Sequence, residues 1–385
     1  MKTNQCYEIL LNYTCNARCL FCSQGDFDKS KNASFDSIIK EIYKAKKNGY
    51  QKLGLSGGEP TVRNDLIEII KAAAKIGFNF IRIQTNGIKL SNFDYAKKLK
   101  EAGLRFCKFS FVSDDPKIYD KLVSINGAYE RSIKAIENMI RLKVRTGNNI
   151  LINKYNYNKL DRLINFLLNK GISNFVIIYP IYTGNMYLNK SLGVSLERCS
   201  PHFIKAVKLL EDKGLGEEIL FLNVPPCFLG EYYQKAIGLD PFNTVVASPD
   251  GDVINLDESS DSNKIKGKVC NKCIMNKRCR GVDKNYIDIF GWKGFKSIKK
   301  EITKYKPVKK EYLTDNEKCL IEILKIENNI PIEKIIKLSK KIPLCYDCQD
   351  GNNIINAANK LANKNVISME FKKGKYYFSL LKDTI

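Results

Sequence analysis

The chain has 385 residues, of which 44% are hydrophobic, and this is enough for two or three domains with substantial cores. No segment approaches the roughly 18 consecutive apolar residues of a membrane-spanning helix, and the first five residues lack the apolar stretch of a secretory signal. The formal net charge is +23, but it is spread along the chain without a long basic block. We therefore expect a cytoplasmic protein with no membrane partner, and we do not favour nucleic acid as a partner, although the charge permits it.

Short β-branched or apolar runs alternate with segments of helical period from residue 5 to about residue 180. This alternation is typical of repeated βα units around a parallel sheet. Six such repeats predict an α/β fold, a partial (βα)6 TIM-like barrel that binds its ligands at the carboxyl ends of the strands. The expected strands cover residues 7–12, 52–55, 80–84, 106–111, 149–152 and 175–179, and the expected helices lie near 34–48, 63–76, 92–102, 128–143 and 157–169.

The pattern changes after Pro180, where a helix near 200–212 precedes an irregular, cysteine-bearing stretch. A lysine-rich connector leads to a last unit, for which the sequence predicts three helices and then two strands around Lys373-Gly374. Three short helices and a hairpin indicate a winged-helix-like domain. The predicted domains are a barrel over 1–190, a small cysteine-rich domain over 191–295 and a winged-helix-like domain over 311–385, with its helices at 314–327, 331–341 and 352–364.

The first functional signal is a loop with three cysteines, Cys15, Cys19 and Cys22, directly after the first predicted strand. A C-x3-C-x2-C run supplies three thiolates from one loop, whereas a [4Fe-4S] cluster normally takes four cysteines. One iron of such a cluster is then free to bind another molecule. On spacing alone, a partial zinc site or disulfide partners are the alternatives.

A second motif, Gly57-Gly58-Glu59-Pro60, follows the second predicted strand. Together with the cysteine loop, it makes the chain resemble the radical S-adenosylmethionine (SAM) enzymes. This resemblance implies a [4Fe-4S] cluster on Cys15, Cys19 and Cys22, with SAM bound to the open iron through its amine and carboxylate. It also implies reductive cleavage of SAM to methionine and a 5′-deoxyadenosyl radical, with an electron from a donor such as ferredoxin or flavodoxin.

The resemblance also implies SAM-binding residues around this loop. Phe21 matches the family's usual aromatic residue near the adenine, although a plain core role is the alternative. Glu59 stands where the family's acidic residue contacts the methionine amine. Gly57 and Gly58 let the backbone approach closely.

Two more candidates follow later strands. Ser110 ends the fourth strand at a position where relatives contact SAM, although Val112 stands here in place of the family's usual aspartate. Asn153 or Asn156, after the fifth strand, is placed to face the ribose, with a turn role as the alternative. The sequence indicates no catalytic residue beyond these binding and ligand positions.

A second cysteine set lies in the irregular stretch and consists of Cys227, Cys270, Cys273 and Cys279. The stretch resembles the SPASM/twitch auxiliary domain of radical SAM enzymes, including a hairpin-like segment, 248–253. Full SPASM domains carry another cysteine just after that hairpin, where residues 255–257 are Asn, Leu and Asp here. We therefore predict one auxiliary [4Fe-4S] cluster on these four cysteines, with a structural zinc as the alternative.

These features predict an enzyme that cleaves SAM reductively and abstracts hydrogen from a substrate, most simply a peptide or protein side chain. The first alternative is a radical SAM enzyme of cofactor or nucleotide biosynthesis, or of RNA modification. The second is an iron-sulfur, winged-helix regulator that binds DNA and senses redox state.

Overall fold

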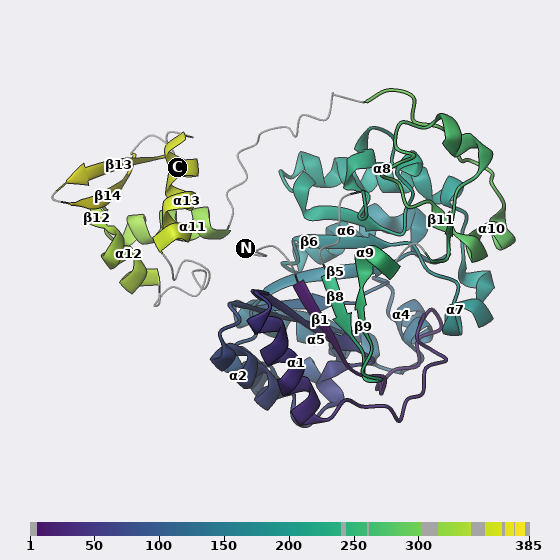
Figure 1. The fold of residues 1–385 in the computed structure, drawn as a ribbon, viewed down its shortest axis with the longest axis horizontal. Coiled ribbons are helices and arrows are strands. Elements are labelled where there is room, and N and C mark those ends of the chain that lie inside the picture. Colours follow the sequence, from purple (N-terminus) through teal and green to yellow (C-terminus); the bar gives the residue numbers. More distant parts are fainter. Residues whose placement is uncertain are drawn as a thin grey trace. The chain divides into compact units, whose positions relative to one another are not determined.

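The computed structural model describes residues 6–239, 244–259, 262–301, 315–339, 351–363, 366–372 and 374–381. The chain folds into two compact units, Met1–Val308 and Lys309–Ile385. Figure 1 shows the first unit from purple to green and the second in yellow-green to yellow. None of the helices in these described ranges is both long enough and apolar enough to cross a membrane.

The first unit is built on a nine-stranded sheet with the order β7-β6-β5-β4-β3-β2-β1-β8-β9. Every pair from β7 to β8 is parallel, and only the edge strand β9 is antiparallel. The six predicted strands are all present and adjacent, which confirms the α/β partial barrel. They are β1 (Cys6–Asn12), β2 (Lys52–Gly57), β3 (Phe80–Thr85), β4 (Phe106–Phe109), β5 (Arg145–Leu151) and β6 (Asn174–Ile178).

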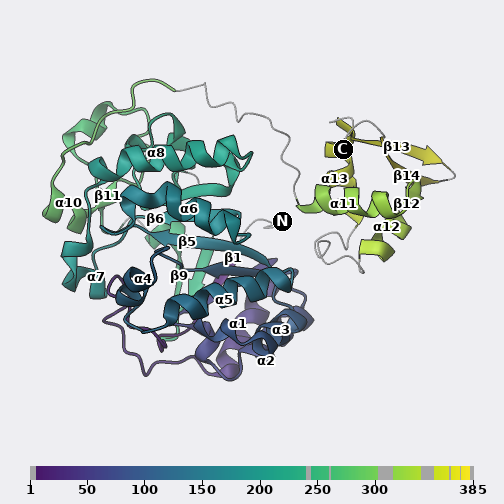
Figure 2. The same ribbon diagram turned by 180° about the vertical axis from the view of Figure 1, so that it is seen from behind.

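Amphipathic helices cover the outer face of this sheet (Figures 1 and 2). Alternate residues of β1, such as Ile9 and Leu11, are fully or almost fully buried, because the side chains of a strand alternate between its two faces. Helix starts are fixed locally: the side chain of Ser34 accepts a hydrogen bond from the amide of Ser37 at 3.2 Å and caps the first helix. The helices are α1 (Phe35–Lys47), α2 (Leu66–Ile76), α3 (Phe93–Ala102), α4 (Pro116–Val123), α5 (Ala128–Arg141), α6 (Leu160–Asn169) and α8 (Leu196–Asp212).

The fourth repeat differs from its prediction in two respects. The strand ends at Phe109 rather than at residue 111, and the additional helix α4 follows it. Asp115 caps this helix by accepting from the amide of Ile118 at 3.0 Å, and Pro116 occupies its first turn. An Asp-Pro pair is therefore a helix start here rather than a plain turn.

A polar network lines the opposite, inner face of the sheet. Arg82 forms an ion pair of 2.6 Å with Glu8, and the Gln84 amide donates to the same carboxylate at 2.8 Å. On the next strand the ammonium group of Lys108 donates to the side-chain oxygen of Asn174 at 2.5 Å. Burial of Lys108, with a smaller contribution from the nearby positive charge of Arg82, lowers its pKa from 10.5 to about 7.

This buried lysine predicts a pH dependence of stability. Between pH 7 and 10.5 the unfolded chain binds a proton on Lys108 that the folded chain has lost, so the free energy of unfolding rises with pH in this window. The stability of Lys108→Met relative to the wild type is therefore expected to fall by roughly 1–3 kcal/mol between pH 7 and 10. Urea unfolding followed by Trp292, the single tryptophan, measures it. The exposed control Lys71→Met should differ from the wild type in free energy of unfolding by an amount that does not change with pH. The same behaviour in Lys108→Met would contradict the prediction.

The sheet is longer than predicted because three strands from the region expected to be irregular join it. They are β7 (Ile219–Leu222), β8 (Thr244–Ala247) and β9 (Val253–Asn255). β7 extends the sheet beyond β6, whereas β8 pairs in parallel with β1 at the other side. Two contacts of Asp250 attach the turn between β8 and β9 to the segment that follows β1. The hydroxyl of Tyr13 donates to Asp250 at 3.0 Å, and Lys31 forms an ion pair with it.

The remainder of the first unit consists of short elements around the second cysteine set. The core is continuous from the barrel into this region. The predicted division between residues 190 and 191 stays a prediction, and both of its sides lie in the first unit. The elements are α7 (Gly184–Leu188), α9 (Leu256–Ser259), β10 (Lys264–Ile265), β11 (Val282–Asp283) and α10 (Lys284–Phe290).

The second unit contains the predicted three helices and hairpin, together with a short additional strand. Its sheet has the order β12-β14-β13 and is antiparallel, and its core contains Leu361 and Phe378. The winged-helix assignment stays a prediction, and Cys345 and Cys348 lie outside the described residues. The elements are α11 (Asp315–Ile326), β12 (Ile330–Pro331), α12 (Ile332–Ser339), α13 (Gly351–Asn363), β13 (Ile367–Lys372) and β14 (Lys375–Leu380).

Candidate metal centres

The three cysteines of the first set lie in the loop that leaves β1 at the carboxyl end of the parallel strands. The loop is held by backbone hydrogen bonds: the amide of Cys22 donates to the carbonyl oxygen of Cys19 at 3.2 Å. The amide of Ala17 donates to the sulfur of Cys15 at 3.4 Å. The three thiols therefore lie at the edge of the sheet where barrels of this kind bind ligands.

The surroundings of Cys15 and Cys19 disfavour the thiolate form of their side chains. Burial raises the pKa of Cys15 to about 11, and burial also raises the pKa of Cys19 well above its ordinary range. A bound metal supplies the positive charge that a thiolate needs at neutral pH. Three sulfur donors on one loop suit iron or zinc rather than a hard cation such as magnesium.

Gly57 and Gly58 bring the GGEP loop against the backbone that leads to Cys15. The amide of Gly58 donates to the carbonyl oxygen of Asn12 at 2.6 Å, and that of Glu59 donates to Thr14 at 2.9 Å. A Cβ on Gly57 would lie 2.3 Å from the oxygen of Asn12, and Gly57 has a φ of 121°. The two glycines thus allow the GGEP loop to lie directly against the backbone of the segment between β1 and Cys15.

This contact predicts a large loss of stability for Gly57→Ala. Gly127 is a matched control, because it also has a positive φ, but a Cβ added there would meet no atom of a non-adjacent residue within 4 Å. We expect Gly127→Ala to cost about 1–2 kcal/mol from backbone strain alone, and Gly57→Ala to cost about 3–5 kcal/mol. Urea unfolding measured by Trp292 fluorescence distinguishes them, and equal losses would refute the steric argument.

Glu59 is 1% exposed and joins the ends of β2 and β3. Its Oε1 accepts hydrogen bonds from Thr61 and from the hydroxyl of Thr85, the latter at 2.7 Å, and its Oε2 accepts from the amide of Asn86 at 2.8 Å. Burial raises the pKa of Glu59, and these hydrogen bonds oppose that effect. The carboxylate fixes the strand ends, and its expected contact with the methionine amine stays a prediction.

The other predicted SAM-binding residues differ in their surroundings. Phe21 is only 8% exposed and packs in the core, whereas Ser110 is half-buried directly after β4. Asn153 is fully buried, and its side chain accepts from the amide of Tyr155 at 2.9 Å and donates to Leu151 at 3.2 Å. Asn156 donates to the same carbonyl group at 2.9 Å. These contacts favour the turn role for both asparagines, and their contact with a ribose stays a prediction.

Sequence reasoning missed two residues that organise the cysteine loop. Asn86 donates to the side-chain oxygen of Asn16 at 2.7 Å, and its amide nitrogen lies 4.0 Å from the sulfur of Cys15. The Thr85-Asn86-Gly87 turn was a recognisable signal, although a plain turn explains it equally well. Asn185 contacts the loop from a segment more than 160 residues away, and nothing in the sequence indicates it.

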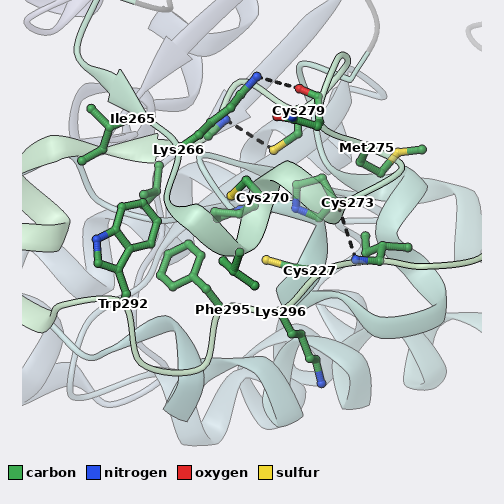
Figure 3. Close-up of a pocket in the computed structure, with 17 residues that line it drawn as sticks. Cys227, Ile265, Lys266, Cys270, Cys273, Met275, Cys279, Trp292, Phe295 and Lys296 are labelled. Atoms are coloured by element: carbon green, nitrogen blue, oxygen red, sulfur yellow. Dashed lines mark hydrogen bonds between the residues drawn. The ribbon is translucent and has the colours of Figure 1, made fainter.

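The second cysteine set converges on one cavity, which Figure 3 shows. Cys227, Cys270, Cys273 and Cys279 all line it, and its empty space, including the open mouth, is about 450 Å³. The described residues that line it include no carboxylate and no histidine. Apolar side chains make most of the remaining wall, among them Pro226, Ile265, Val269, Met275, Trp292 and Phe295.

Backbone amides point at two of these sulfurs. The amide of Gly281 donates to Cys279 at 3.3 Å, and that of Ile298 donates to Cys273 at 3.4 Å, as the dashed lines in Figure 3 show. Burial raises the pKa of Cys227 to about 12 and also raises that of Cys279. Such donors stabilise a metal-bound thiolate, so the site fits a thiophilic metal or an iron-sulfur cluster.

In the described part of the chain, no three His, Cys, Asp or Glu side chains come together closely enough to hold one metal ion.

The sequence of residues 9–167 matches the radical SAM superfamily. These residues therefore form a radical SAM domain, and the [4Fe-4S] cluster and SAM are the cofactors that such a domain implies. A probable GTP 3′,8-cyclase of Sulfurisphaera tokodaii is 31% identical over 180 residues, which are 46% of this chain and 56% of the relative. One of Saccharolobus islandicus is 30% identical over 46% of this chain and 58% of the relative. The chain therefore matches less than two thirds of the length of these curated relatives.

Solved structures share the fold over a larger part of the chain. Streptococcus suis SuiB bound to the precursor peptide SuiA superposes with a TM-score of 0.57 at 14% identity, over 73% of this chain and 72% of SuiB. The enzyme anSMEcpe with bound AdoMet and the Kp18Cys peptide gives a TM-score of 0.56 at 14% identity, over 72% and 88%. At such identities the likeness shows a common fold, and that fold extends beyond the radical SAM domain.

Proposed function

We propose that the chain is an enzyme that cleaves SAM reductively and abstracts hydrogen from a peptide or protein side chain. Cys15, Cys19 and Cys22 would hold the SAM-binding [4Fe-4S] cluster. When bound, this cluster supplies the electron that splits SAM into methionine and a 5′-deoxyadenosyl radical. Glu59 holds the strand ends of β2 and β3 in place beside it, and Ser110 lies at the same edge of the sheet.

The second part of the proposal is an auxiliary [4Fe-4S] cluster held by Cys227, Cys270, Cys273 and Cys279. A cubane takes each thiolate on a different iron, so its ligands are distributed around a cavity, as these four are. A structural zinc on the same thiols is the alternative.

The fold shared with two structures solved with peptides carries the peptide assignment, and the four-cysteine cavity limits how a substrate can bind. With four thiolates, no iron of an auxiliary cluster is left open, so a substrate that coordinates this cluster directly has no position there. The fold shared with SuiB and anSMEcpe, both solved with peptides, supports the same substrate class. The net charge of +23 favours acidic partners, including an electron donor such as ferredoxin or flavodoxin.

The nucleotide branch is the second candidate, because the curated relatives are named as probable GTP 3′,8-cyclases. An experiment on substrate class separates the two. Reconstituted full-length chain receives SAM and dithionite without oxygen, with GTP or with peptides encoded by short reading frames beside its gene. We expect 5′-deoxyadenosine above the substrate-free level, together with a mass change, for a peptide. Stimulation by GTP, with consumption of GTP, would establish the nucleotide branch instead.

A further inference from the structure

The segment around α7 contacts the backbone of the first cysteine loop. The side-chain amide of Asn185 donates to the carbonyl oxygen of Cys19 at 2.9 Å. The backbone amide of Asn185 donates to the carbonyl oxygen of Cys22, also at 2.9 Å. Asn189, one turn later, donates to Leu20 at 3.1 Å. Three hydrogen bonds from α7 and the residue directly after it therefore hold the loop between its second and third thiols.

Close packing strengthens this contact. Gly184 has a φ of 52°, and a Cβ there would lie 2.7 Å from the amide nitrogen of Gly25 and 2.8 Å from the carbonyl oxygen of Cys22. A Cβ on Gly25 would in turn lie 2.2 Å from the side-chain oxygen of Asn185. The hydroxyl of Thr183 donates to Ser23 at 3.2 Å. We call residues 183–189 the clamp.

The clamp is also joined to the auxiliary cysteine region. Asn285, six residues after Cys279 in the sequence, donates to the carbonyl oxygen of Tyr182 at 3.0 Å, directly before the clamp. Asp283 fixes Asn285 by accepting from its amide at 2.9 Å. The fully buried ring of Tyr182 lies 6.0 Å from that of Phe290, at the end of the same helix α10.

An aromatic cluster reinforces this connection. The ring of Tyr286 lies 6.0 Å from Phe295, which lines the auxiliary cavity, and 5.6 Å from Tyr179 at the end of β6. The hydroxyl of Tyr286 accepts from the amide of Leu196 at 3.1 Å. Contiguous packed side chains of this kind can carry an energetic coupling between two sites, which only a coupling measurement demonstrates.

We propose that Asn185 is a positioning residue for Cys19 and Cys22, and that Asn285 links this positioning to the auxiliary cysteine site. The loop has little regular structure of its own, so hydrogen bonds that order it in advance lower the cost of assembling three thiolates around one cluster. The second part of the proposal, the link through Asn285, rests on the proposed function, because it assumes that a cluster occupies each of the two cysteine sites.

The first test uses metal-free, full-length chain and measures hydrogen exchange of the amides in residues 19–25. We expect Asn185→Ala and the isosteric Asn185→Asp to exchange about tenfold faster there than the wild type, since each removes the side-chain donor to the partly buried carbonyl oxygen of Cys19. Asn285→Ala should give a smaller increase of the same kind. Leu188→Ala on α7, where the side chain is 79% exposed, and Lys284→Ala on α10 are the controls. Exchange equal to the controls would overturn the positioning role.

The second test uses chain reconstituted with iron and sulfide and follows the rate at which a chelator removes the cluster whose EPR signal changes with SAM. We expect Asn185→Ala to accelerate this loss about tenfold. Removing the auxiliary site by Cys270→Ala with Cys273→Ala should accelerate it about threefold, and adding Asn285→Ala should have no further effect. If adding Asn285→Ala to the two cysteine replacements multiplied the rate of cluster loss, the proposed link through Asn285 would be overturned. If wild-type chain forms no SAM-sensitive signal, the proposed function fails, while the exchange measurement still decides the positioning role.

Discussion

Replacing Cys19 by alanine is expected to remove about four iron atoms per chain and to lower SAM cleavage at least a hundredfold. The reason is that Cys15, Cys19 and Cys22 are the only thiols on the loop, and two thiolates from one loop do not hold a cubane.

The measurement pairs iron analysis with chromatography of 5′-deoxyadenosine from anaerobically reconstituted protein. Cys6→Ala is the matched control, since Cys6 begins β1, the strand that leads to the loop, but belongs to neither cysteine set. We expect this control to retain iron and SAM cleavage near the wild-type level. Full iron content and SAM cleavage in Cys19→Ala would show that the cysteine loop does not hold the cluster that cleaves SAM.

Replacing Cys273 by alanine is expected to have a large effect of a different kind. The variant should lose about four other iron atoms per chain yet still cleave SAM slowly in the absence of substrate. Modification of substrate should fall by more than about a hundredfold. Because a metal centre stabilises the fold around it, we also expect the first unit to melt several degrees lower.

The control for this variant is Cys199→Ala, which removes a buried thiol of α8 outside both sets. Metal analysis of the purified proteins decides between the two centres that four thiols permit. About four iron atoms and one tightly bound zinc per wild-type chain would establish the structural zinc and refute the auxiliary cluster.

The barrel was predictable from sequence because each repeat carries two independent patterns. A strand buried on its outer face, such as β3, shows apolar residues at alternate positions, and the helix after it has an amphipathic period that ends at a glycine, as α3 does at Gly103. The strand β7 and the pairing of β8 with β1 were missed because both lie outside the regular βα repeats, whereas the hairpin-like segment 248–253 is present as the turn between β8 and β9. The places of β7 and β8 in the sheet are fixed by pairing with β6 and β1, partners that local sequence does not reveal.

The candidate sites divide in the same way. The spacing of Cys270, Cys273 and Cys279 indicates ligands locally, and Cys227, which follows two prolines, was assigned to them as the fourth thiol; all four line one cavity. Asn185 was not predictable, because an isolated asparagine in a short helix has no local signature. Its contact with Cys19 exists only once the segment after β6 packs on the loop after β1.

The most direct test of the central claim is the fate of SAM in the presence of the wild-type chain. Full-length protein reconstituted with iron and sulfide is incubated with SAM and dithionite without oxygen, beside a Cys15→Ala sample treated identically. We predict equal amounts of methionine and 5′-deoxyadenosine from the wild type and none above background from the variant. Intact SAM in a wild-type sample that carries its full iron would contradict the account.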